Sequence, residues 1–359
     1  MLICAGMHKI PPVLAPLIYI PGLVFETMVR ARGALYSAAL LPQQRLPGPV
    51  ISVGNITMGG AGKTPLVIYV AQVLAELGLH PAILSRGYGR RNPGKSHILP
   101  PGALVPSPAL SLGDEPALVR RHIPSVWMGI SKNRFVAGSS IAKQQIRPAF
   151  ILDDGFQHRK LHRDLDIVVI DRSQPFATNS IFPRGTLREP LAELSRCHMV
   201  VINGHPETGM PDLIEAEIRG LNAKATIFHC SQVIRTMVQF RDWREGRDQR
   251  ISFGPVRSAY LVAALGNPER FHRDILRLDI EVRGTRFFTD HKWIDGREWQ
   301  SCAAEARIKK ADAIITTEKD AIKISQPPDF PLLVSVQSTE MSKANAFKAV
   351  LRNCIEEYA

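Results

Sequence analysis

The sequence has few cysteines, and they are dispersed. Of its 359 residues only five are cysteine, with no CxxC pair and no spacing typical of a zinc site. We therefore expect reduced thiols in a cytosolic chain, which excludes a disulfide framework and a zinc-organised fold. The sequence also lacks a repeat of about 20–50 residues and any low-complexity block, so solenoid and fibrous architectures are excluded.

A long apolar run is also missing. Residues 10–25 carry no charge, but four prolines interrupt them, and a membrane-spanning helix needs about 20 consecutive apolar residues. Nothing at the start of the chain frames a cleaved signal. Residues 24–41 place apolar side chains near helical period and add Arg30 and Arg32. Such a helix can lie in a membrane interface, although periodicity alone favours packing on the core.

Acidic residues are the scarcer charged class. The 33 Asp and Glu stand against 45 Lys and Arg, which gives a net charge of +12. This balance favours an anionic partner, either nucleic acid, an anionic membrane surface or a phosphorylated substrate, without choosing among them. The length suggests two domains, each able to bury a core.

Short apolar runs alternate with helical stretches in the first part of the chain. Pro65 and Gly78 bound a helix over residues 63–77, and Ser131 is expected to cap a helix that runs to about Ile146. Strands are expected at residues 49–53, 82–85, 126–128, 150–154, 167–171 and 199–203. Ile- and Val-rich strands between helices predict a mostly parallel sheet covered on both faces.

A second block with the same alternation begins after about residue 228. Residues 227–240 have the pattern of a strand-like connector, and a last helix is expected over residues 342–357. Further strands are expected at residues 259–266, 282–288, 313–317 and 332–336. The fold class is therefore α/β, with a boundary between two lobes near residue 228.

The stretch SVGNITMGGAGKTP, residues 52–65, has the character of a phosphate-binding loop. Its glycines free backbone N–H groups, a helix N-terminus follows, and Lys63 and Thr64 are the residue types that meet phosphate oxygens and Mg²⁺. Thr57 stands where the motif usually has its first glycine, but it needs only an allowed φ. The alternative is a glycine turn with an exposed lysine. The candidate nucleotide-binding residues are Thr57, Gly59, Gly60, Ala61, Gly62, Lys63 and Thr64.

Two carboxylates end a buried strand in ILDDGFQH, residues 151–158. Asp153 and Asp154 would be costly there unless a cation is near, and a strand of this kind beside a phosphate loop places an Asp to hold Mg²⁺. Gln157 and His158 follow closely enough to face the same site. The alternative is a solvated Asp-Asp-Gly turn.

Several other charged residues could be either functional or structural. Asp114 and Glu115 precede a helix. Asp114 would either deprotonate a hydroxyl nucleophile or cap that helix, and the spacing alone favours the cap. His291 follows Asp290 at a strand end and would be structural or face a cleft between the lobes. Arginine clusters at residues 85–91, 131–134 and 182–190 suit phosphate recognition or a solvated surface.

Eight motifs occur in a fixed order: SVGNITMGGAGKTP, SRGYGR, GDEP, DDGFQH, FPRGTLREP, GNPERF, DHKW and TTEKD. Together they resemble the tetraacyldisaccharide 4'-kinases, the lipid A 4'-kinases of Gram-negative bacteria, from about residue 12 to about residue 340. In that family the loop also lacks the early glycine, so Thr57 is the expected form.

The resemblance implies a P-loop NTPase-like α/β/α sandwich with a smaller C-terminal α/β lobe. Residues 1–45 would form an amphipathic, membrane-associated segment. For the helix in residues 24–41, the resemblance therefore favours the membrane interface over the core packing that periodicity alone favours. The kinase core would span residues 46–228 and the second lobe, with its strand-like connector, residues 229–359.

The resemblance also implies the activity. The family transfers the γ-phosphate of ATP to the 4'-hydroxyl of tetraacyldisaccharide 1-phosphate, giving lipid IV-A, with ATP and Mg²⁺ as cofactors. The implied partners are this lipid A disaccharide and the inner-membrane surface, with peripheral attachment at its cytoplasmic face. Neither nucleic acid nor an obligate protein partner is expected.

The roles of individual residues follow from the same resemblance. Asp114 matches the family's proposed catalytic base, assisted by a histidine at the position of His291, and Lys63 is placed at the phosphates. The candidate metal ligands are Thr64, Glu115, Asp153 and Asp154. Gln157 and His158 match further nucleotide-site positions.

Two other function classes remain open from the residues. A regulatory NTPase or metallochaperone GTPase would use the same loop, and TEKD, residues 317–320, is similar to a guanine-reading motif. A nucleic-acid-binding protein would explain the positive charge, but no dedicated motif and little interleaving of aromatic and basic residues support it.

Overall fold

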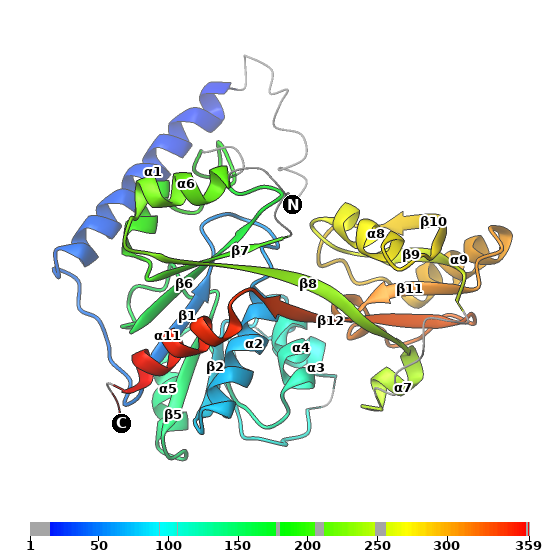
Figure 1. Ribbon diagram of the computed structural model, residues 1–359, viewed down its shortest axis with the longest axis horizontal. Coiled ribbons are helices and arrows are strands. Elements are labelled where there is room, and N and C mark those ends of the chain that lie inside the picture. Colours follow the sequence, from blue (N-terminus) through cyan, green and yellow to red (C-terminus); the bar gives the residue numbers. More distant parts are fainter. Residues whose placement is uncertain are drawn as a thin grey trace.

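One 12-stranded sheet runs through the whole molecule in the order β10-β9-β11-β12-β8-β7-β6-β1-β5-β2-β4-β3 (Figure 1). The computed structural model describes residues 15–92, 94–105, 107–176, 180–204, 212–247, 256–356 and 358. The sheet has two parts, each covered by helices, and they are joined by two long strands. The α/β fold class expected from the sequence is confirmed.

The first lobe is built on seven of these strands. They are β1 (Val50–Gly54), β2 (His80–Ser85), β3 (His97–Leu99), β4 (Trp127–Ile130), β5 (Pro148–Asp153), β6 (Leu165–Asp171) and β7 (Met199–Asn203). Parallel pairing places β1 between β5 and β6, so their carboxyl ends meet at one edge. All five residues of β1 and of β7 are buried, as the continuous apolar runs predict.

Helices cover both faces of this lobe. They are α1 (Ala15–Ser37), α2 (Lys63–Glu76), α3 (Pro108–Leu112), α4 (Asp114–His122), α5 (Arg134–Ala142), the 3-10 helix η2 (Leu191–Arg196) and α6 (Leu213–Leu221). The predicted cap of α5 is wrong: Asn133, not Ser131, caps it by accepting from the Val136 N–H at 3.3 Å. The Ser131 N–H instead donates to the Ser85 carbonyl at 3.0 Å and stays with the sheet.

The second lobe repeats the pattern on a smaller scale. Its elements are α7 (Phe240–Arg244), β9 (Ser258–Ala263), α8 (Pro268–Leu276), β10 (Glu281–Phe287), α9 (Gly296–Ile308), β11 (Ala313–Thr317) and α10 (Glu318–Ala321). β9 lies between β10 and β11, parallel to both. A separate apolar cluster around Trp299, Tyr260 and Ile314 forms its core.

Two long antiparallel strands join the lobes. β8 (Thr226–Gln239) begins beside β7 in the first lobe, and β12 (Leu332–Met341) begins beside β11 in the second. They pair from Cys230↔Met341 to Leu333↔Gln239, with a bulge at Val336/Gln337. The predicted connector is therefore a full strand of the sheet, and the two lobes are continuous through it (Figure 1).

The last helix, α11 (Ala344–Glu356), packs on the first lobe. Its Phe347 is fully buried, with ring centroids 5.6 Å from Tyr69 of α2 and 5.2 Å from Phe228 of β8. The sequence predicted that this helix belongs to the second lobe. Its packing shows that it belongs to the first, which corrects the predicted range of the second lobe. The boundary near residue 228 otherwise stays a prediction.

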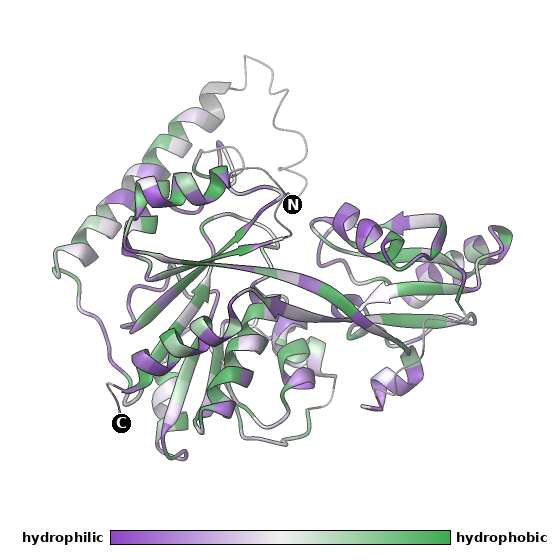
Figure 2. Cartoon of the chain, viewed as in Figure 1, coloured by the Kyte–Doolittle hydropathy of each residue, from purple (hydrophilic) through white to green (hydrophobic). Residues whose placement is uncertain are grey.

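The helix α1 lies along the outside of the first lobe. Arg159 donates to the Gly33 carbonyl and Arg32 to the Gln157 carbonyl, which ties its C-terminal half to the segment that follows β5. Figure 2 shows apolar and polar residues alternating along it. In the part of the chain that the structure describes, no helix combines the length and apolarity needed to cross a membrane. Residues 1–14 of the predicted N-terminal segment lie outside the described residues.

Candidate active site

The glycine loop, residues 54–62, connects β1 to α2 and requires glycine at its end. Gly62 has φ +88°, and a Cβ there would lie 2.2 Å from Nδ2 of Asn203. Asn203 ends β7, and its Nδ2 donates to the Ala61 carbonyl at 3.0 Å. A side chain at position 62 would therefore push the loop away from β7.

Thr57 forms an isolated antiparallel bridge with Leu187, an extended pairing that threonine adopts readily. The next residue, Met58, donates its N–H to the Thr186 carbonyl at 2.6 Å. The first half of the loop is thus held by residues 182–190 rather than by a glycine, which explains why the early glycine is dispensable.

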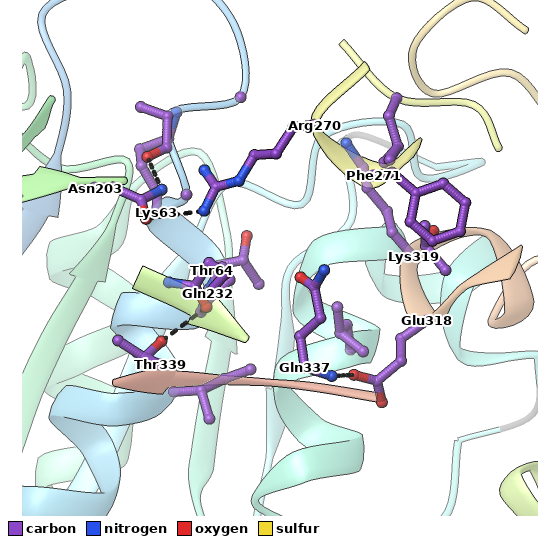
Figure 3. A pocket seen from close by; sticks show the side chains of 18 of the residues that line it. Lys63, Thr64, Asn203, Gln232, Arg270, Phe271, Glu318, Lys319, Gln337 and Thr339 are labelled. Carbon is purple, nitrogen blue, oxygen red and sulfur yellow. Dashed lines mark hydrogen bonds between the residues drawn. The ribbon is translucent and has the colours of Figure 1, made fainter. Parts of the chain in front are cut away.

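A cavity of about 500 Å³ opens between the lobes above this loop (Figure 3). The first lobe contributes Lys63 and Thr64 at the start of α2 and Glu115 on α4. The joining strands and the second lobe contribute the other walls, which include Gln232, Gln337, Thr339, Arg270, Phe271, Asp290, Glu318 and Lys319. The cavity therefore needs both lobes.

Lys63 and Asp154 form one end of an ion-pair chain. The Lys63 Nζ lies 3.5 Å from Oδ1 of Asp154, whose two oxygens accept from Nη1 of Arg188 at 2.8 and 2.7 Å. Burial alone would raise the pKa of Asp154, but the charges of Lys63 and Arg188 hold it below its ordinary value. Asp154 therefore stays ionised and orients the lysine.

Asp153 is in the opposite situation. It is 4% exposed, its Oδ2 accepts from the Ser85 hydroxyl at 2.9 Å, and its Oδ1 has no hydrogen-bond partner. Burial, with the negative charges of Glu115 and Asp154, raises its pKa to about 7. A buried carboxylate with an unpartnered oxygen, near enough to Glu115 and Asp154 to feel their charge, supplies the oxygen donors that divalent cations prefer. These residues fit Mg²⁺.

Asp114 meets His291 across the lobes. Asp114 is the first residue of α4, and its Oδ2 lies 2.8 Å from Nδ1 of His291, which follows β10 with φ +63°. Burial alone would raise the pKa of Asp114, but the hydrogen bond from His291, with the charges of Lys319 and Lys323, holds it below the ordinary value. The same hydrogen bond raises the pKa of His291.

The second ring nitrogen of His291 has a cationic neighbour. Lys319 places its Nζ 3.3 Å from the His291 Nε2 and 3.1 Å from Oδ1 of Asp290. An ammonium group cannot accept, so in this contact the Nε2 of a neutral imidazole accepts and the ring proton lies on Nδ1, facing Asp114. Burial alone would lower the pKa of Lys319, but Glu115, Asp290 and Asp114 raise it.

Of the sequence candidates, the cavity lining includes Gly60, Ala61, Gly62, Lys63, Thr64 and Glu115 but not Thr57, Gly59, Asp114, Asp153, Asp154, His291, Gln157 or His158. The last two lie behind the glycine loop. Gln157 donates to the Asn55 carbonyl at 2.9 Å and so supports the start of the loop. His158 is half-buried, and burial together with the charge of Arg134 lowers its pKa to about 4. A direct contact of either residue with a nucleotide stays a prediction.

Several cavity residues carried no assigned role in the sequence. Asn203 ends an apolar strand whose carboxyl end faces the loop, a position that the strand order would have indicated. Arg270 lies in GNPERF, to which the sequence assigned no chemistry, and Lys319 lies in TTEKD, which the sequence connected only with guanine reading. Asp290 directly precedes His291, and nothing in the sequence separates the roles of the two residues.

The guanine-reading alternative does not fit the environment of TEKD. Asp320 is 2% exposed, accepts from the Ala264 N–H at 3.0 Å and from the Thr317 hydroxyl at 2.8 Å, and pairs with Lys323 at 2.9 Å. A carboxylate that reads guanine must face the ligand, whereas this one stabilises the second lobe.

The loop geometry makes a testable prediction. Gly62→Ala is expected to weaken nucleotide binding at least tenfold, because the new Cβ overlaps Asn203 and the residue loses its left-handed backbone. Gly220→Ala, on α6 and outside the cavity lining, is the matched control, since no atom lies within 4 Å of its added Cβ. Fluorescent-nucleotide titration would measure both, and equal affinities for Gly62→Ala and the wild type would contradict the role given to Gly62.

Comparison with known proteins supports the family resemblance seen in the motifs. The profile of the tetraacyldisaccharide-1-P 4'-kinase family matches residues 14–356. The tetraacyldisaccharide 4'-kinase of Desulfotalea psychrophila is 33% identical over 92% of this chain and 94% of its own. That of Anaeromyxobacter sp. strain Fw109-5 is 38% identical over 89% of this chain and 85% of its own.

A solved structure is similar over nearly the whole length. LpxK from Aquifex aeolicus, in a crystal structure in complex with ATP, has a TM-score of 0.71 and 27% identity, covering 96% of this chain and 98% of its own. The fold expected from the resemblance is confirmed. The chain belongs to the tetraacyldisaccharide-1-P 4'-kinase family.

Proposed function

We propose that this protein transfers the γ-phosphate of ATP to the 4'-hydroxyl of tetraacyldisaccharide 1-phosphate, a step of lipid A biosynthesis. Membership of the family supports the reaction. The observation that carries it in this chain is the Asp114–His291 contact of 2.8 Å beside the cavity of the glycine loop. A phosphate cradle and a candidate base for a hydroxyl acceptor thus belong to one site.

The chemistry follows from these two parts. Asp114, kept ionised by His291, accepts the proton of the 4'-hydroxyl while that oxygen attacks the γ-phosphorus. The bond from the γ-phosphorus to the bridging oxygen breaks, and ADP leaves with the bonding electron pair. His291 holds the carboxylate in place and stabilises the ionised form through its Nδ1–H.

The first lobe holds the nucleotide during this transfer. Backbone N–H groups of the glycine loop and the N-terminus of α2 face the phosphates. Lys63, oriented by Asp154, balances the negative charge of the phosphate oxygens. Removing the lysine would leave Asp154 paired with Arg188 alone and the phosphates without their cation.

Asp153, Glu115 and the Thr64 hydroxyl are the residues we assign to Mg²⁺. The unpartnered oxygen of Asp153 supports this assignment. When bound, Mg²⁺ neutralises charge on the β- and γ-phosphate oxygens. Asp154, already engaged by Lys63 and Arg188, is proposed to orient the lysine and to add negative charge near the ion rather than to be its main ligand.

We also propose peripheral attachment to the cytoplasmic face of the inner membrane through α1. Its outer surface exposes large apolar side chains at Tyr19, Ile20, Leu23, Val24 and Met28. Such a face, with Arg30 60% exposed beside it, suits the interface of an anionic bilayer. A four-chain lipid acceptor resides in that interface, so attachment brings the site to its substrate.

The activity is tested by a thin-layer assay of labelled γ-phosphate transfer to the purified disaccharide in detergent micelles. We expect transfer from ATP and little from GTP. Asp114→Asn should lower kcat by about 10²–10⁴-fold, the usual contribution of a general base. ATP affinity should be retained, because the glycine loop is intact. Equal use of GTP, or an Asp114→Asn variant with normal turnover, would contradict the proposal.

Membrane attachment is tested by vesicle co-sedimentation. The double variant Leu23→Asp/Val24→Asp is expected to reduce binding to anionic phosphatidylglycerol vesicles at least tenfold, since both side chains are about half exposed on α1. Ile308→Asp, at an exposed apolar position of the second lobe, is the matched control. Undiminished vesicle binding by the α1 variant would exclude this surface as the attachment site.

A further inference from the structure

We propose that Arg270 is a catalytic residue that the second lobe supplies to the phosphates, where its guanidinium stabilises the charge that develops during transfer. This inference rests on the proposed function. GNPERF, residues 266–271, is the motif that carries Arg270, and neither the glycine loop nor the Asp114–His291 pair accounts for it.

The motif is built to present this side chain. Pro268 begins α8, and Asn267 caps the helix by accepting from the Arg270 N–H itself at 3.2 Å. The Asn267 Nδ2 also donates to the Ser173 hydroxyl of the first lobe at 3.3 Å. Phe271 and Ile275 are buried in the second lobe and anchor the helix. The first turn of α8 is thereby fixed against the opposite lobe.

The turn before α8 lies directly over the glycine loop. A Cβ at Gly266 would be 4.0 Å from the Gly60 nitrogen and 3.2 Å from Oδ2 of Asp290. Both Gly266 and Arg270 line the same cavity as Lys63 and Thr64. The second lobe therefore reaches the position where the loop's N–H groups would meet phosphate.

The guanidinium points at the loop. Its Nη2 donates to Oδ1 of Asn203 at 3.4 Å, and Asn203 in turn donates to the Ala61 carbonyl. Figure 3 shows Arg270 reaching from the second lobe toward Asn203 beside Lys63. One amide side chain therefore separates this cation from the backbone of the phosphate cradle.

The ion pair of Arg270 within its own helix does not explain this position. Its Nε lies 3.9 Å from Oδ2 of Asp274, beyond hydrogen-bond distance. The side chain is 23% exposed, toward the cavity, and its planar fork of donors matches phosphate oxygens. Arg270 is therefore placed to contact the phosphate oxygens that face the second lobe, on the side opposite Lys63.

The chemical role follows from where charge moves. As the bond from the γ-phosphorus to the bridging oxygen breaks, negative charge grows on that oxygen and on the equatorial oxygens. Lys63 is held in the first lobe by Asp154, whereas Arg270 and His291 both belong to the second lobe. The second lobe therefore supplies both the histidine that keeps the base ionised and the cation that stabilises the developing charge.

The test compares Arg270→Ala, Arg270→Lys and the control Arg273→Ala in the full chain, where Arg273 is an exposed arginine of the same helix. Arg270→Ala should lower kcat by about 10²–10³-fold with less than a threefold change in the KM for ATP. Arg270→Lys should recover part of the loss, and millimolar guanidinium ion should partly rescue Arg270→Ala. Arg273→Ala should match the wild type.

A binding measurement separates a catalytic from a structural role. Arg270→Ala should bind ADP normally but lose affinity for ADP with aluminium fluoride and Mg²⁺, a mimic of the transferring phosphoryl group, by about the factor lost in kcat. Unchanged kcat, a loss confined to the KM for ATP, or unchanged affinity for the mimic would overturn the assignment. A wild type without transfer activity would refute the proposed function instead, and the aluminium fluoride comparison would still decide the role of Arg270.

Discussion

The hydrogen bond between Asp114 and His291, 2.8 Å long, is the interaction on which the account of this site depends. It joins the first residue of α4 to His291, which follows the end of β10 by four residues, and the two elements belong to different lobes. A buried carboxylate at this position would gain a proton without a hydrogen-bond donor, and the Nδ1–H of the histidine keeps it ionised. The base is therefore competent only when the lobes are together.

The rest of the fold keeps the lobes in that arrangement. β8 and β12 form one antiparallel ribbon shared by both parts of the sheet, and α11 at the end of β12 packs on the first lobe. A second contact, between His122 at the end of α4 and Glu318 of α10 at 3.0 Å, holds the same helix that carries Asp114. The cavity of the glycine loop is closed by these contacts, and Arg270 enters it from the same lobe as His291.

Local features of this site could be predicted from the sequence, and contacts between distant segments could not. The strand, loop and helix around Lys63 follow from spacing alone, because β1, its glycines and α2 are consecutive. Asp153 could be recognised as costly at the end of a buried strand. Asp114 and His291 could be identified only by resemblance. They are 177 positions apart in the sequence, and their spacing does not indicate that they come into contact. Asn203 and Arg270 depend on the order of strands and on how the second lobe lies over the first, which periodicity does not encode.

The most direct test of the central claim is a double-mutant cycle on the kcat of phosphate transfer with Asp114→Asn, His291→Gln and the double variant. Groups that act as one unit give strongly non-additive effects. We predict that the double variant is no slower than Asp114→Asn alone, because the histidine works only through the carboxylate. A double variant whose loss equals the product of the two single losses would contradict the account.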